Sequence, residues 1–206
     1  MALPKANDTG AQVLEEDVLR AQHYRLLARF LSAAPDAELL ELAARLGGDE
    51  ATDLGKGLDV LARAAGQTTP EAAGDEFDAL FVGDGVRGEL LPYCSYYLTG
   101  FLNEKPLANL RGDMARLGIA RADDVTDPED HIGAICEMMA GLIVGDFGAP
   151  LDLAGQKAFF DAHLAPWAEK FFEELEAAES ASLYMPVGTI GRVFMGIEST
   201  AFQMVA

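Results

Sequence analysis

The chain has 206 residues, half of them hydrophobic, and its 34 acidic residues against 15 basic ones give a formal charge of -19. This length and hydrophobic content support a sizeable core and predict a single domain over residues 1–206. The charge argues against nucleic acid as a partner, because phosphates would be repelled, and favours a basic partner such as a cationic peptide. Acidity that only keeps an abundant protein in solution would give the same composition.

The sequence predicts neither a membrane anchor nor an export signal. The N-terminus lacks a basic region followed by an apolar run, and no uninterrupted apolar stretch reaches about 18 residues. Cys94 and Cys136 are too few for a disulfide scaffold and do not form a C-x-x-C motif. We therefore expect a cytoplasmic protein with reduced thiols and no membrane insertion.

Apolar residues at spacings of three and four predict four helices before residue 83. The first covers residues 11–32, with Leu19 on its apolar stripe, and the third covers residues 50–65. The second begins at Pro35 and Asp36 and is stopped by the glycines at 47 and 48, and the fourth follows Thr69 and Pro70 and ends at Gly83. The glycine-rich residues 83–89 form a loop.

The remainder of the chain also has helical periodicity. An aromatic-rich stretch leads into a short helix that ends near Gly100, and a polar connection over residues 119–127 is the candidate hinge. No strand alternation of useful length is present, so the predicted fold class is all-α, a single-domain helical bundle of about 9–11 helices. The other helices are expected over residues 104–117, 127–147, 151–163, 167–178 and from 184 onward.

The start of the helix after residue 127 carries an acid–histidine pair. Asp127 can cap this helix, and Pro128 fits its first position because the missing N–H would have no partner there. Asp130 lies where a carboxylate can reach back to the cap, whereas His131 lies on a different face. The pair therefore either fixes the adjoining loop or contacts a ligand.

Metal binding and catalysis have weak support. None of the histidines, His23, His131 and His163, belongs to a Glu-x-x-His pattern, so no metal site is expected. His23 is predicted to be a partly buried structural residue, and His163 to order the bend at Pro166, for example by hydrogen bonding a carbonyl that the proline leaves free. No nucleophile elbow or phosphate-binding loop is present, and we expect no catalytic residue.

Four segments, in order, resemble the TorD/DmsD/NarJ family of chaperones for redox enzymes. Residues 77–83 are similar to its aromatic-x-x-Leu-Phe-x-Gly segment, and residues 91–98 to its Pro-Pro-Tyr-Glu-Ser-x-Tyr-Leu segment. Residues 130–139 resemble its Asp-His-x-x-x-Glu-Leu-x-Phe-Met helix, and residues 160–167 its His-Leu-x-Pro-Trp bend. With an all-helical background, the resemblance extends over about residues 15–200.

The resemblance implies a TorD-like fold and a binding function without catalysis. Family members bind the twin-arginine signal peptides of molybdenum-cofactor oxidoreductases and hold the precursor for cofactor insertion before export or assembly. No cofactor is expected, and binding of guanine nucleotide is implied by the resemblance alone. The positions of this chain that correspond to the family's peptide-binding places are Phe77, Leu80, Phe81, Pro92, Tyr93, Ser95, Tyr97, Asp130 and His131.

The sequence departs from the family pattern at two carboxylate positions. Cys94 and Ile135 stand where the family often has Glu, so the arginine pair would have to meet Glu89, Asp130 or Glu137 instead. Residues 96–106 resemble a branch associated with formate dehydrogenases, which suggests the client.

Two other functions remain open from the residues alone. One is a small helical nucleotide hydrolase using Asp130 and His131, and the other is a general acidic scaffold or regulator. The oligomeric state is equally open: the protein could be a monomer, or a dimer formed by domain swapping at the hinge.

Overall fold

The computed structural model describes residues 14–83, 87–121 and 127–204, and these residues form helices joined by turns and loops, with no strand. They confirm the all-α fold class and the predicted number of helices, with one π-helical segment, Asp78–Val82, that continues α4. The α-helices are α1 Glu15–Ser32, α2 Ala37–Ala43, α3 Asp53–Ala65, α4 Pro70–Phe77, α5 Cys94–Thr99, α6 Lys105–Leu117, α7 Ile132–Val144, α8 Leu153–His163, α9 Ala168–Ala177 and α10 Tyr184–Gln203.

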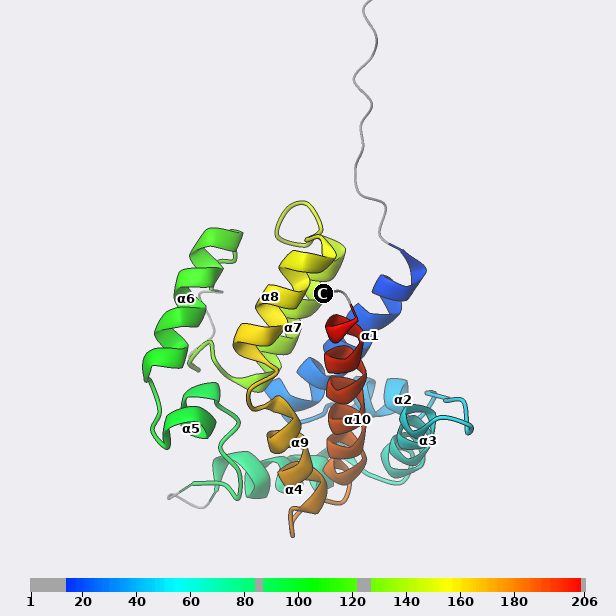
Figure 1. The fold of residues 1–206 in the computed structure, drawn as a ribbon. Coiled ribbons are helices and arrows are strands. Elements are labelled where there is room, and N and C mark those ends of the chain that lie inside the picture. The colour runs from blue at the N-terminus through cyan, green and yellow to red at the C-terminus, as the bar shows by residue number, and fades with distance from the viewer. Residues whose placement is uncertain (1–13, 84–86, 122–126, 205–206) are drawn as a thin grey trace, which may run out of the picture.

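Helix α7 lies at the centre of the bundle (Figure 1). Its residues are apolar on every side, and from Ile132 to Ile143 all are buried except Ala134 and Glu137. A helix of this kind must be covered all round. Helix α1 packs along α7, α8 also packs against it, and α10 packs against α9 and α3. Figure 1 shows α5 and α6 on one flank of this centre and α2 and α3 on the other.

Several predicted helix boundaries are confirmed, and others differ from those in the structure. Asp36 caps α2 as expected, but α2 ends at Ala43, before the glycines. The predicted end at Gly83 is correct, although the last turn is π-helical, with the Gly83 N–H donating to the Asp78 carbonyl at 2.7 Å. Leu19 is 51% exposed, so its assignment to the apolar stripe of the first helix was wrong.

The bend between α8 and α9 differs from the expectation for His163. The His163 ring does not bond a carbonyl freed by Pro166; its Nε2 lies 2.7 Å from Asp113 Oδ2 on α6. The His163 carbonyl instead accepts a hydrogen bond from Trp167 Nε1 at 2.7 Å. The histidine therefore joins α6 to α8, while the tryptophan holds the bend.

The candidate hinge and the domain organisation stay predictions. Residues 122–126 of the hinge lie outside the described residues. None of the helices described is long and apolar enough to cross a membrane.

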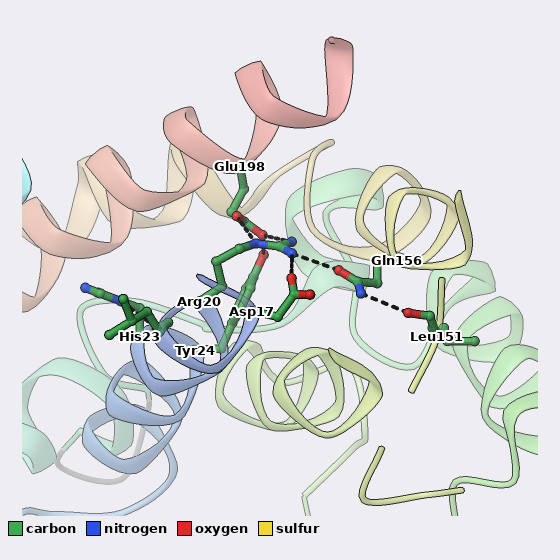
Figure 2. A network of polar contacts seen from close by, with 8 residues as sticks. Asp17, Arg20, His23, Tyr24, Leu151, Gln156 and Glu198 are labelled. Carbon is green, nitrogen blue, oxygen red and sulfur yellow. Dashed lines mark hydrogen bonds and ion pairs between the residues drawn. The ribbon is translucent and has the colours of Figure 1, made fainter. Parts of the chain in front are cut away.

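A buried polar network connects α1, α8 and α10 (Figure 2). Glu198 is 1% exposed, and its two oxygens accept from Arg20 at 2.8 and 2.7 Å. Tyr24 donates to the same carboxylate at 3.0 Å, and Arg20 also donates to Asp17 and Gln156. Because every charge in the network has a partner, it fixes the first helix against the last one without leaving an unpaired buried ion.

We predict that Glu198→Ala will lower the free energy of unfolding by about 3 kcal/mol, because it leaves Arg20 partly buried without its main partner. The double variant Arg20→Met/Glu198→Leu should be clearly more stable than this single variant. Urea denaturation measures both, with Glu41→Ala in the exposed Arg45–Glu41 pair as the control, which should cost about 0.5 kcal/mol or less. Equal losses for Glu198→Ala and Glu41→Ala would contradict the role of the network.

Candidate functional site

Two of the segments singled out in the sequence meet at the start of α7. Residues 92–94 run antiparallel to residues 130–132, with an isolated bridge between Tyr93 and His131. The Cys94 N–H donates to the Asp130 carbonyl and the Ile132 N–H donates to the Pro92 carbonyl, both at 2.9 Å. We call residues 92–95 and 130–132 the clasp. It attaches the beginning of α5 to the beginning of α7.

Asp130 is a structural part of the clasp. It is 1% exposed, and its Oδ2 accepts from the Ser95 N–H at 2.8 Å. It therefore stabilises the first turn of α5 rather than reaching back along α7, which corrects the capping role expected from its spacing. Its second oxygen, Oδ1, is buried and has no hydrogen-bond partner in the described part of the chain.

His131, rather than Asp127, is the N-cap of α7, which begins at Ile132. Its Nδ1 accepts from the Gly133 N–H at 3.1 Å, so the ring proton belongs on Nε2. Burial lowers the pKa of His131 to about 4, although Asp127 and Asp130 act in the opposite direction. The ring is therefore neutral at pH 7. Because the histidine supplies the cap, Pro128 and Asp130 lie in a turn before the helix, not inside it.

The neighbouring side chains support the clasp and are poor nucleophiles. The rings of Tyr93 and His131 pack edge to face with 5.2 Å between their centroids. Ser95 is fully buried, and its Oγ accepts from the Glu104 N–H. Burial, assisted by Asp130, raises the pKa of the Cys94 thiol to about 12, so Cys94 stays protonated at pH 7.

The other predicted peptide-binding residues lie against the C-terminal helices. The Tyr97 hydroxyl donates to Glu174 on α9 at 2.6 Å, and its ring packs against Trp167 and Phe171. Phe77 and Phe81 are half-buried against the ring of Tyr184 on α10, while Leu80 is fully buried. The structure thus brings Pro92, Tyr93, Ser95, Asp130 and His131 together, and places Phe77, Leu80, Phe81 and Tyr97 in packing positions elsewhere.

A groove lies beside the clasp, with a volume of about 680 Å³. We call it the α6–α7 groove. His131 and Glu137 line it from the start and the exposed face of α7, and residues from the ends of α1 and α6 also line it. Sequence reasoning missed its apolar lining, because those residues come from separate elements and only Met138 among its large apolar side chains lies in one of the motif segments. The apolar lining residues with the largest side chains are Met114, Ile119, Met138 and Phe147.

Three carboxylates line the groove, and they differ in burial and in ion pairing. Burial opposes the ionisation of Glu129, but Arg111 at 2.7 Å and Arg121 at 3.3 Å hold the pKa of Glu129 below its usual range. Glu129 is therefore already neutralised. Asp127 and Glu137 are exposed, and Glu137 has no ion pair among the described residues. Glu89, also considered from sequence, accepts from the N–H groups of residues 179 and 180 and is engaged outside the groove.

Within the described residues, no group of three or more His, Cys, Asp or Glu side chains could hold a metal ion. The fold and the groove together define an all-helical protein with an acidic groove that has an apolar lining. Residues 48–173 match the family described as nitrate reductase delta subunit, and the chain belongs to this family. The resemblance to TorD/DmsD/NarJ chaperones found from the motifs is thereby confirmed.

Known relatives agree with this assignment. The chain is 29% identical to the chaperone protein TorD of Vibrio cholerae over 132 residues, covering 61% of this chain and 59% of that protein. It is 31% identical to the chaperone protein TorD of Photobacterium profundum over 118 residues, 53% of this chain and 54% of that protein. The matches thus span less than two thirds of these relatives. Their names describe chaperones, in agreement with the prediction of a non-catalytic protein.

The fold has a solved counterpart. A crystal structure of a protein assigned to redox enzyme maturation, from Archaeoglobus fulgidus, superposes with a TM-score of 0.56 at 22% identity. The match covers 87% of this chain and 93% of that one, which confirms the TorD-like helical fold.

We predict that the stability of the protein falls as pH drops from about 6.5 toward 4, in part through His131. The pKa of His131 in the folded state lies below its value in the unfolded state. The stability that depends on neutral His131 is therefore complete above about pH 6.5. It is lost at lower pH because the unfolded state then gains a proton that the folded state does not take up. His131→Asn, which can still cap α7, should reduce the change in urea midpoint between pH 7 and 5. An unchanged pH dependence in this variant would refute the assignment.

Proposed function

We propose that the protein is a cytoplasmic chaperone that binds the twin-arginine signal peptide of a molybdenum-cofactor oxidoreductase and holds the precursor for cofactor insertion. The observation that carries the proposal is the α6–α7 groove, which combines an apolar lining with exposed carboxylates beside the clasp. The TorD relatives, which are chaperones by name, support the class of activity. The formate dehydrogenase client rests on the resemblance of residues 96–106 alone.

The groove lining suits the apolar region of a signal peptide. Met114 and Met138 have flexible, polarizable side chains that can adapt to different apolar sequences, while Phe147 adds a large ring that is 36% exposed. Apolar burial contributes roughly 25 cal/mol for each Å² removed from water, before the entropic cost of ordering the peptide. Most of the affinity should therefore come from this lining.

The arginine pair would contact Glu137 and Asp127 at the groove rim. These carboxylates are exposed, whereas Glu129 is paired with arginines and Asp130 is buried in the clasp. A guanidinium can form a bidentate pair with an exposed carboxylate without first displacing another partner. Glu137 thus replaces the carboxylates that the family motif places at the positions of Cys94 and Ile135.

His131 would contact the peptide backbone. Its Nδ1 is occupied by the N-cap of α7, so the remaining Nε2–H can donate to a peptide carbonyl from the groove wall. Asp130, Pro92, Tyr93 and Ser95 hold this ring in place through the clasp. The more distant predicted residues, Phe77, Leu80, Phe81 and Tyr97, would act by supporting the helices around the site. The mechanism requires no resident cofactor.

The hydrolase alternative is less well supported by the geometry. A hydrolase would need a free base and a nucleophile or bound metal. His131 is used as a cap, and Cys94 is held protonated by burial. A general acidic scaffold remains distinguishable by experiment, because it would bind any basic helix equally well.

We predict that Glu137→Lys will weaken binding of a synthetic twin-arginine signal peptide by roughly tenfold, since it places a like charge next to the arginine pair. Fluorescence anisotropy with the full chain measures the dissociation constant. Replacing the two arginines of the peptide by glutamine should remove most of the difference between variant and wild type.

Glu38→Lys, on the exposed face of α2, changes the net charge equally and is the matched control. It should leave the affinity within about twofold. If both variants weaken binding equally, the net charge rather than the groove attracts the peptide, and the general acidic scaffold becomes the better description.

A further inference from the structure

A second hollow lies on the opposite flank of α1, between α1, α2 and α3, with a volume of about 540 Å³. We call it the α1–α3 hollow. It is bounded by α1, by α2 and the residues that follow it, and by α3. No residue of the α6–α7 groove contributes to it, so it is a separate site. Its lining consists of Gln22, His23, Arg25, Leu26, Arg29, Leu42, Leu46, Gly47 and Leu58.

The charge of this hollow is opposite to that of the molecule as a whole. The chain has 34 acidic residues, yet no carboxylate lines the hollow, whereas two arginines do. Arg25 donates to Asp146 at 2.5 Å, but this pair is about half exposed and leaves other guanidinium N–H groups of Arg25 available. Arg29 is exposed and has no ion pair among the described residues. The rim therefore keeps a positive charge after Asp146 is counted.

The floor of the hollow is apolar. Leu26 belongs to α1, Leu42 to α2 and Leu58 to α3, with Leu46 following α2. Leu42 is 44% exposed, so part of this apolar floor is accessible to a partner. Burying this leucine surface against a partner would be favourable at roughly 25 cal/mol per Å².

The polar residues of α1 that line the hollow are spaced so that a partner helix could pair with them. Gln22, Arg25 and Arg29 follow one another at intervals of one helical turn, along about 10 Å of the surface. An antiparallel or parallel helix lying beside them would place carboxylates one turn apart opposite Arg25 and Arg29. Its leucines on the adjoining face would meet Leu42, Leu46 and Leu58.

We propose that the α1–α3 hollow is a docking site for an acidic amphipathic helix of a partner protein. Leucine-type side chains of this helix fill the apolar floor, and its glutamates pair with Arg25 and Arg29. A small anionic amphiphile is disfavoured, since the hollow is open to solvent over three helices, whereas small-molecule sites enclose most of their ligand. This site is independent of the proposed signal-peptide groove and has the opposite charge preference.

The test uses an 18-residue peptide with leucines at helical spacing and glutamates one turn apart, labelled with fluorescein, and the full chain. Anisotropy should show saturable binding, and the same peptide with lysines in place of glutamates should bind at least roughly tenfold more weakly. Arg29→Glu should weaken binding of the acidic peptide by roughly tenfold. The milder variant Arg29→Gln should weaken binding less. It provides a test of the site if Arg29→Glu fails to fold.

Arg63→Glu provides the matched control, because Arg63 is exposed on α3, lies outside the hollow and gives the same change in net charge. It should leave the affinity within about twofold. Equal weakening by Arg29→Glu and Arg63→Glu, absence of saturable binding, or displacement of the peptide by equimolar dodecanoate would each overturn the proposal. Neither arginine variant should weaken binding of the twin-arginine peptide, so the two proposals can fail separately.

Discussion

The near-complete burial of α7, in which Glu137 is the one exposed residue, is the constraint on which the rest of the structure depends. A helix with an apolar residue at almost every position cannot face water, so α1 and α8 pack against it. Its first N–H groups must also be satisfied inside the protein. The His131 ring accepts one and the Pro92 carbonyl another, which brings the chain before α5 to this point. The clasp is thus a consequence of burying the end of an apolar helix.

Burial of the start of α7 also determines the roles of Asp130 and His131. Asp130 is buried because it joins α5 to α7, and His131 is neutral because it is buried and acts as a cap. Neither residue is free to act alone, so we propose that recognition falls to the adjoining groove, which His131 lines. The Arg20–Glu198 network holds α1 against α10. Helix α1 contributes residues to both surfaces, its C-terminal end to the α6–α7 groove and Gln22 to Arg29 to the α1–α3 hollow.

The helices could be predicted because periodicity and caps are local: Asp36 and Thr69 mark helix starts as expected. The predicted start of α7 was too early, because Asp127 and Pro128 form a valid cap when only local sequence is considered. His131 is the N-cap in the structure because the contact with residues 92–94 fixes the chain at this point. The groove could not be predicted, since Met114, Phe147 and Glu137 meet only through tertiary packing. The motifs indicated its position through Asp130 and His131, but not its lining.

The most direct test of peptide binding in the α6–α7 groove is hydrogen–deuterium exchange of the full chain with and without a twin-arginine signal peptide. Binding in the α6–α7 groove should slow exchange at residues 114–121 and in the first turns of α7, and leave residues 22–47 unchanged. Protection confined to the α1–α3 hollow or to α9 and α10, with no change around His131, would contradict it.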